Sequence, residues 1–283
     1  MARDNGPLVV CVINLKGGVG KSTIAALLAQ RAYSYRAKDV LAIDIDPQAN
    51  LSQALTRQQY NTFLTNKAPS IVEVFAGYRP PNNPVKSGPT SLSVNDVAHT
   101  VYSSAGRSLQ LIPSRFDFSD NLTQSVRPDP RVLARFLSNE FQNKDIIIID
   151  CAPTESILTH AAYHASGLVL VPVKPEYFAT IGFPLLHESL TDFSRHNRGH
   201  NISVAGVVIN NGFYDGGNDG GPEKQQAILD IKAYAKKNGW HIFKNEIPFS
   251  RGFPKLMRGN HNHSGNADRF HLFADEFFNR IGL

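Results

Sequence analysis

A glycine-rich segment that directly follows an apolar run constrains the fold of this chain more than any other feature. The apolar run is Leu8–Ile13 (LVVCVI), and the glycine-rich segment is Lys16–Thr23 (KGGVGKST). An unbroken apolar run is typical of a strand buried on both faces of a parallel sheet. A strand that ends in such a turn and opens a helix leaves several backbone N–H groups free, and these suit anionic oxygens. Residues 7–35 therefore predict a strand–turn–helix unit that binds a nucleotide phosphate.

Two side chains of the glycine-rich segment are also suited to bind the nucleotide and its metal ion. In the general phosphate-loop pattern G-x-x-x-x-G-K-[ST], the lysine reaches the terminal phosphates and the hydroxyl binds Mg²⁺, and Lys21 and Ser22 occupy these places. The segment departs from the pattern because Asn14 or Leu15 stands near the place of the first glycine, and because a second lysine, Lys16, opens the loop. It is therefore a deviant phosphate loop.

Two further apolar runs end in aspartates that suit a metal site. The run at 40–46 (VLAIDID) ends in Asp44 and Asp46, and the run at 145–150 (DIIIID) ends in Asp150. Because the carboxyl ends of parallel strands share one edge of the sheet, we expect these carboxylates to meet the phosphate loop in one crevice. Three separate segments thus predict the same site.

The order of the predicted elements indicates an α/β fold with a mostly parallel, twisted sheet and helices on both faces, as in P-loop NTPases. With 283 residues, of which 42% are hydrophobic, the chain can bury a large core, and we expect a single domain over 1–283. Proline and glycine mark loops at 77–89, 215–222 and 258–265. We expect strands near 8–13, 40–45, 109–112, 145–149, 168–173, 203–209 and 242–247, and helices near 21–35, 130–141, 179–197, 222–238 and 267–281.

The ordered motifs resemble the ParA/MinD family of deviant Walker ATPases, with the closest similarity to the ParA (Soj-like) partition ATPases. The motifs that carry the resemblance are KGGVGKST, the IDIDPQ segment at 43–48 and the IIIDCAP segment at 147–153. Residues 205–210 and 247–248 are similar to the family's two late strand ends at the nucleotide base. The resemblance implies that the chain hydrolyses ATP to ADP and phosphate with Mg²⁺. Turnover is expected below the roughly 1–100 s⁻¹ of kinases, because a stimulating partner is implied.

The resemblance also implies roles for the acidic residues and the loop. It makes Asp150 the Walker B carboxylate, Asp46 the residue that orients the attacking water, and Asp44 a residue near the water shell of the metal. The implied metal site consists of Ser22, Asp150 and Asp46. The implied phosphate cradle consists of Lys16, Gly17, Gly18, Val19, Gly20, Lys21, Ser22 and Thr23.

Lys16 has the most specific role that the resemblance implies. In the family, this signature lysine reaches across a dimer interface to the nucleotide of the other subunit, so hydrolysis requires an ATP-bound homodimer. Phosphoryl transfer spreads negative charge over equatorial oxygens, and a second lysine can stabilise it as an arginine finger does. The implied catalytic set is therefore Lys16, Lys21, Asp46 and Asp44. Asn210 and Pro248 are implied to contact adenine.

The charge of the chain is compatible with an anionic partner. The net charge is +5 and the isoelectric point is about 9.2, which suits nucleic acid or anionic lipid without sequence specificity. In ParA relatives, basic residues of the later helices of the ATP dimer bind DNA non-specifically, and a ParB-like or cargo-adaptor protein stimulates hydrolysis. Basic residues gather in the second half of the chain, among them Arg195, Arg198, Lys224, Lys232, Lys236, Lys237, Arg251, Lys255 and Arg258.

The favoured function is thus a ParA-like ATPase that partitions or positions a plasmid, a chromosome or a protein assembly. The first alternative is a MinD-like ATPase that cycles on and off a membrane through a C-terminal amphipathic helix. The helix at 267–281 has apolar residues at 270, 273, 277 and 281, but Asp275 and Glu276 favour packing on the core over a membrane role. A second alternative is a P-loop enzyme that acts on a small substrate. Without a leader or a long apolar run, we expect a cytoplasmic protein. If it binds DNA, we expect it to associate with the nucleoid.

Three remaining features carry weaker expectations. Cys11 and Cys151 are expected to be core residues at opposite ends of the core. The proline-rich stretch 77–93 is either a partner-docking insertion or an inert surface loop. His261 and His263 lie in a polar, glycine-bearing loop without cysteines, and we assign them no metal.

Overall fold

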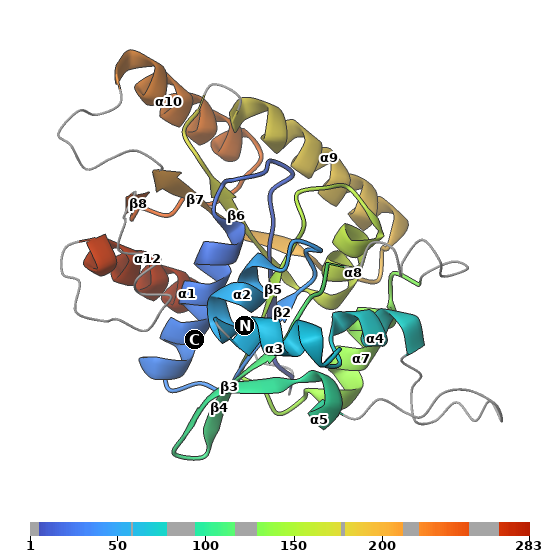
Figure 1. The fold of residues 1–283 in the computed structure, drawn as a ribbon. Helices are drawn as coiled ribbons and strands as arrows, with labels where there is room; N and C mark the ends of the chain where they lie inside the picture. The colour runs from blue at the N-terminus through green and yellow to red at the C-terminus, as the bar shows by residue number, and fades with distance from the viewer. Residues whose placement is uncertain are drawn as a thin grey trace.

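The sheet of this protein is mostly parallel and lies between two layers of helices (Figure 1). The computed structural model describes residues 6–57, 59–77, 94–116, 129–176, 179–211, 221–248 and 266–283. Within these residues, eight strands are arranged in the order β3-β4-β2-β5-β1-β6-β7-β8. The strands are β1 Leu8–Val12, β2 Val40–Asp44, β3 His99–Ser104, β4 Arg107–Ile112, β5 Ile146–Asp150, β6 Leu168–Val173, β7 Ser203–Asn211 and β8 Ile247–Pro248.

The central strands are buried on both faces, as their unbroken apolar runs predict. Every residue of β2 and β5 is buried, and neighbouring strands are parallel except for the antiparallel pair β3 and β4. The register aligns Val12 and Asp44 with Asp150. The ends of β1, β2 and β5 therefore lie at one edge of the sheet, where the phosphate loop begins.

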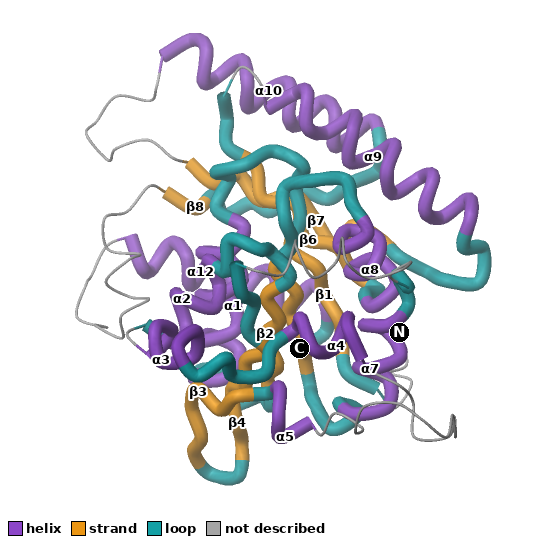
Figure 2. The backbone as a smooth tube through the Cα atoms, turned by 45° about the vertical axis from the view of Figure 1, so that its right-hand side comes forward, coloured by secondary structure: helices purple, strands orange, loops and turns teal. Residues whose placement is uncertain are grey.

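The helices divide into two layers over the sheet (Figure 2). One apolar core contains side chains of α1, α2 and α12, and the other contains side chains of α4, α7, α8, α9 and α10. The helices are α1 Lys21–Ser34, α2 Asn50–Thr56, α3 Gln59–Thr65, α4 Ile71–Gly77, α5 Val94–Val97, α7 Val132–Glu140, α8 Ile157–Ala165, α9 Ala179–His196, α10 Gly221–Lys237 and α12 Asn266–Ile281.

The predicted α/β fold is confirmed, with differences in the short elements. Sequence reasoning missed β3, α2, α3, α4, α5 and α8. The expected strand at 242–247 is reduced to an isolated bridge at Ile242 and to β8. Gly221 was assigned to the loop at 215–222, but it begins α10. Pro222, where the helix was expected to begin, lies in the first turn of α10, a position that proline favours because it needs no N–H donor there.

The C-terminal helix α12 packs on the core, as its apolar stripe predicts. Phe270, Phe273 and Phe277 are each at most 2% exposed. On the polar side, the guanidinium of Arg31 donates to Asp275 at 3.1 Å, which ties α12 to α1. Within the part of the chain that the structure describes, no helix is long and apolar enough to cross a membrane.

The expectation that Cys11 and Cys151 lie at opposite ends of the core is wrong. Both thiols are fully buried in the same apolar cluster. Cys11 on β1 aligns with Ile149 on β5, and Cys151 follows two residues later, so the two side chains point to the same face. Burial, with the neighbouring Cys11 thiol, raises the pKa of Cys151 well above its ordinary value.

Several expectations lie outside the described residues. They are the stretch 78–93, the loop at 258–265 with His261 and His263, and the basic residues Arg251, Lys255 and Arg258. Gly77, the first residue of the expected insertion, is the last residue of α4.

Candidate nucleotide-binding site

The phosphate loop needs its glycines for backbone conformation and for space. Gly18 and Gly20 have φ angles of +73° and +91°, in the left-handed region that other residues rarely adopt. A Cβ on Gly20 would lie 2.2 Å from Nδ2 of Asn210. Gly20 is the N-cap of α1 and makes no side-chain capping bond, so the first N–H groups of this helix remain available for an anion.

Lys21 lies inside the loop that precedes it. Its side chain is largely buried, at 6% residue exposure, and Nζ donates to the backbone oxygen of Lys16 at 3.1 Å. Burial lowers the pKa of Lys21, while the charges of Asp150 and Asp46 act in the opposite direction. A desolvated ammonium enclosed by a glycine loop is well suited to bind phosphate oxygens.

Asp44 is fully buried and holds the start of α2. Its Oδ2 accepts hydrogen bonds from the backbone N–H of Ser52 at 2.8 Å and from the Ser52 hydroxyl at 2.7 Å, and its Oδ1 accepts the N–H of Asp46 at 3.1 Å. Burial raises the pKa of Asp44 to about 7 although these hydrogen bonds lower it. Asp44 thus fixes the backbone that presents Asp46.

Asp150 differs from Asp44 because, among the described residues, the structure gives its carboxylate oxygens no hydrogen bond. It is fully buried, and neither oxygen accepts a hydrogen bond from any residue that the structure describes. Burial and the neighbouring Asp44 raise the pKa of Asp150 well above its ordinary value, whereas the nearby Ser22 hydroxyl and Lys21 ammonium lower it. A buried carboxylate without hydrogen bonds next to a hydroxyl fits an oxygen-ligand site for Mg²⁺.

Asp46 lies in the turn that follows β2 and is 6% exposed. Its Oδ1 accepts the backbone N–H of Gln48 at 2.9 Å, and its backbone oxygen accepts the N–H of Ala49 at 2.8 Å. The structure therefore brings Asp44, Asp46 and Asp150 to one edge beside the phosphate loop, as the strand ends predict.

The entrance of the phosphate loop is attached to the end of β6 through Asn14. The Asn14 Nδ2 donates to the backbone oxygen of Pro172 at 2.8 Å, and its Oδ1 accepts the N–H of Lys16 at 2.9 Å. Sequence reasoning noted Asn14 only as a departure from the glycine pattern. A polar residue at the end of a fully apolar strand is the signal that could have identified this role.

Lys16 forms an ion pair that sequence reasoning missed. Its Nζ lies 2.6 Å from Oε2 of Glu176, and the two side chains are 26% and 43% exposed. Glu176 follows β6 and lies 160 positions away along the chain. The structure thus places Lys16 at the loop entrance beside the residues that lead into α9.

Asn210 also contacts the phosphate loop, because its Nδ2 donates to the backbone oxygen of Val19 at 2.8 Å. Its strand β7 pairs with β8, so that Asn211 aligns with Pro248. Asn210 and Pro248 thus lie at the same strand ends as the loop. Their contact with adenine stays a prediction.

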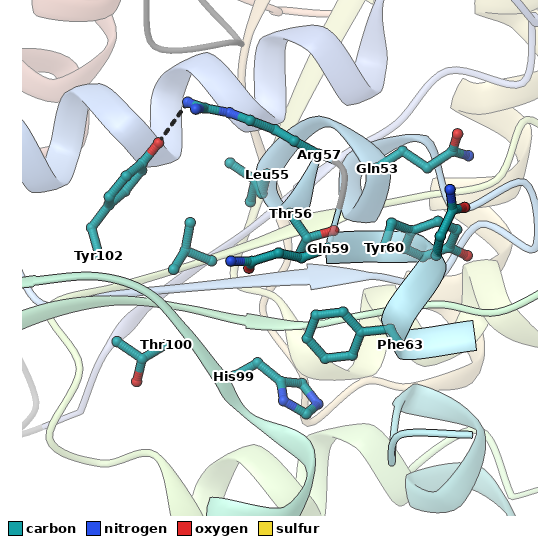
Figure 3. Close-up of a pocket in the computed structure, with 12 residues that line it drawn as sticks. Gln53, Leu55, Thr56, Arg57, Gln59, Tyr60, Phe63, His99, Thr100 and Tyr102 are labelled. Atoms are coloured by element: carbon teal, nitrogen blue, oxygen red, sulfur yellow. Dashed lines mark hydrogen bonds between the residues drawn. The ribbon is translucent and has the colours of Figure 1, made fainter. Parts of the chain in front are cut away.

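A groove of about 900 Å³ lies elsewhere, between the helices α2 and α3 and the strand β3 (Figure 3). Arg57 extends across it and donates to the Tyr102 hydroxyl at 2.9 Å, and Phe63 stacks edge-on against His99. None of the predicted site residues lines this groove. It is therefore separate from the candidate nucleotide site.

Comparisons with known proteins identify the family of this chain. Residues 8–204 match the family AAA_31, described as an AAA domain. The sporulation initiation inhibitor protein Soj of Bacillus subtilis is 28% identical over 240 residues, which cover 85% of this chain and 83% of Soj. The chromosome partitioning protein ParA of Myxococcus xanthus is 28% identical over 239 residues, covering 83% and 74% of the two chains.

The fold is also found in a solved structure. The ATP complex of a single-residue variant of Cyanothece McdA superimposes with a TM-score of 0.77 at 20% identity, covering 98% of this chain and 97% of that one. At this identity the similarity supports the fold alone. It agrees with the mostly parallel sheet and the loop described above.

Proposed function

The chain belongs to the AAA_31 family and is a P-loop ATPase of the ParA/Soj type. From this premise we propose that it is an ATP-dependent switch that acts while bound to DNA. In this proposal the protein binds ATP and Mg²⁺, forms a homodimer, holds DNA non-specifically and partitions or positions a cargo. A ParB-like or cargo-adaptor protein stimulates hydrolysis and releases the DNA. The protein then works in the cytoplasm, on the nucleoid when ATP is bound.

The observation that carries the proposal is the buried, unpaired Asp150 beside the phosphate loop. Its carboxylate and the Ser22 hydroxyl would hold Mg²⁺, which supplies positive charge next to the phosphates. The free N–H groups at Gly20 and the start of α1 bind phosphate oxygens. Lys21, already enclosed by the loop, neutralises the terminal phosphates.

Hydrolysis in this proposal uses the loop entrance and the turn after β2. Asp46 holds the attacking water in line, a task that requires position more than basicity. Lys16 stabilises the charge on the phosphate of the partner subunit. Gly182 of α9 lies against the Lys16 side chain, and Leu185, one helical turn later, is 51% exposed. In this proposal the face around these residues contacts the partner subunit.

Non-specific DNA binding is supported by the helices α9 and α10, which lie side by side along one flank (Figures 1 and 2). Lys232, Lys236 and Lys237 on α10 are exposed, as are Arg195 and Arg198 at and after the end of α9. Exposed basic residues on adjacent helices match the phosphate backbone without reading bases.

The MinD-like alternative has less support, because α12 places its apolar stripe in the core and pairs Asp275 with Arg31. Such a helix would have to leave the core before it could lie in a membrane.

The proposal is tested by fluorescence anisotropy of a random-sequence DNA duplex titrated with the protein in Mg²⁺ with ATP, ADP or no nucleotide. Each titration is done at two salt concentrations. Binding that is tight only with ATP and weaker at higher salt is the expected result. Equal binding in all three nucleotide states would contradict the switch, and ATP-dependent sedimentation with anionic liposomes instead of DNA would favour the membrane alternative.

A further inference from the structure

The ammonium of Lys16 is already engaged by a carboxylate of its own subunit. The distance from Nζ to Oε2 of Glu176 is 2.6 Å, and the Lys16 backbone N–H is held by Asn14. The ion pair directs this ammonium toward its own subunit, so contact with the nucleotide of the other subunit competes with it. The trans role proposed for Lys16 is therefore favoured when the ion pair with Glu176 is weakened or broken.

Glu176 is placed by the end of β6 and by the approach of α9. Its backbone N–H donates to the oxygen of Lys174 at 2.9 Å, which turns the chain sharply after the strand. At the first turns of α9, a Cβ on Gly182 would lie 3.1 Å from Oδ1 of Asn14 and 3.6 Å from Cβ of Lys16. The loop entrance, Glu176 and α9 thus form one contiguous contact.

We propose that Glu176 is a positioning residue that restrains Lys16 in the nucleotide-free subunit and releases it when a triphosphate competes for the ammonium. This inference rests on the proposed function, and it identifies the regulation of that same site. Glu176 precedes α9 in the chain, and Gly182 of α9 lies against Lys16. The ion pair therefore lies next to the helix that carries part of the basic surface.

The strength of the Lys16–Glu176 ion pair depends on how far its two side chains are exposed to solvent. The two side chains are 26% and 43% exposed, so the pair is screened by water and stabilises the restrained state weakly. We expect its removal to lower the nucleotide concentration at the midpoint of dimerisation about two- to fivefold per subunit. High salt produces the same shift in the wild type and little shift in a variant without the pair.

The test compares wild type, Glu176→Gln, Lys16→Ala and the double variant. Dimer formation is followed by analytical ultracentrifugation against AMP-PNP, with Glu188→Gln as the control that removes an exposed glutamate from α9. We expect Glu176→Gln to lower the midpoint in the presence of Lys16 and to have no effect in the Lys16→Ala background. An unchanged midpoint, or an equal shift in both backgrounds, would overturn the inference.

A second readout does not depend on dimerisation. The rate at which acetic anhydride labels Lys16 in the nucleotide-free protein is measured by mass spectrometry of the corresponding peptide. We expect faster labelling of Lys16 in Glu176→Gln than in wild type and in Glu188→Gln. If AMP-PNP produces no dimer in any variant, the proposed dimer fails, whereas faster labelling still supports the restraint and equal labelling overturns it.

Discussion

Asp150 lowers the stability of the fold and at the same time suits a metal site. A buried carboxylate without hydrogen bonds destabilises the folded protein, yet the same lack of hydrogen bonds suits a cation. Asp44, its neighbour in register, shows the opposite solution, because Ser52 and Asp46 satisfy its oxygens. The two aspartates lie at equivalent strand ends, but they differ in the hydrogen bonds that their carboxylates accept.

Asp150→Asn is expected to stabilise the nucleotide-free protein at pH 8. An unfolded aspartate ionises at its ordinary pKa of 3.8, whereas the pKa of Asp150 is raised in the folded protein. The folded state therefore loses stability as pH rises through the raised pKa. We expect a gain of about 1–3 kcal/mol in the free energy of unfolding at pH 8, which disappears in acid.

This prediction is checked by thermal unfolding in EDTA at pH 5 and pH 8, with Asp230→Asn on α10 as a control. Equal or lower stability of Asp150→Asn at pH 8 would contradict it. The same variant should lose the stabilisation that Mg²⁺ and ATP give to the wild type.

Lys21→Ala and Lys16→Ala are expected to have separable effects. Lys21 lies inside the loop, so we expect its loss to weaken ATP binding about a hundredfold, the equivalent of one strong charge-assisted hydrogen bond. Lys16 points to Glu176, so we expect its loss to spare ATP binding while it impairs turnover. Isothermal titration calorimetry and a phosphate-release assay measure the two effects, and similar affinities for both variants would contradict the assignment.

At the scale of elements, the long elements and the strand ends could be predicted, whereas the short connecting helices could not. The signals for β1, β2, β5 and the phosphate loop are local, since they consist of apolar runs and turn glycines. The edge strand β3 (HTVYSS) has no buried residue, and its place depends on antiparallel pairing with β4. Glu176 was missed for a related reason, because its partner Lys16 is distant in the sequence.

The attachment of α12 provides a test at this scale. Glu276 accepts hydrogen bonds from the backbone N–H groups of Lys244 and Asn245 at 2.9 and 3.1 Å. Burial acts to raise the pKa of Glu276, but these hydrogen bonds lower it below its ordinary value of 4.5. The stabilisation is therefore present above pH 4.5 and is lost as pH falls through the lowered pKa.

Glu276→Gln is accordingly expected to lower the free energy of unfolding by about 1 kcal/mol at pH 7. The difference from wild type should decrease as the pH falls below 4.5. Urea unfolding at pH 7 and pH 4 measures the effect, with Glu188→Gln as the control. A constant difference at both pH values would show that the charge of Glu276 is not what stabilises α12.

At the scale of the whole molecule, the phosphate loop and the basic helices α9 and α10 are attached to strands of one sheet. The loop follows β1, and α9 follows β6, which pairs directly with β1. The proposed coupling of nucleotide state to DNA binding therefore needs no hinge between domains. The affinity of such electrostatic binding falls as the salt concentration rises, and the slope of this fall gives the number of phosphate contacts.

The double substitution Lys232→Ala and Lys236→Ala is expected to weaken ATP-dependent DNA binding equally for all sequences. The slope of log affinity against log salt should fall by about 0.9 for each lysine that contacts a phosphate in each subunit. The control is the pair Lys38→Ala and Lys67→Ala, which removes the same charge away from α9 and α10. Anisotropy at four salt concentrations measures both slopes, and equal slopes for the two double variants would exclude the α10 surface.

The order of the strands also has a consequence for the synthesis of this protein. In the finished sheet β1 lies between β5 and β6, and Leu8 pairs with Ile146. At about 5–20 residues per second, a ribosome makes the partners of β1 on the order of ten seconds after β1 itself. During that interval the strand that carries the phosphate loop has no sheet to join, so the nascent chain must keep an apolar segment from aggregating before the ATP site can form.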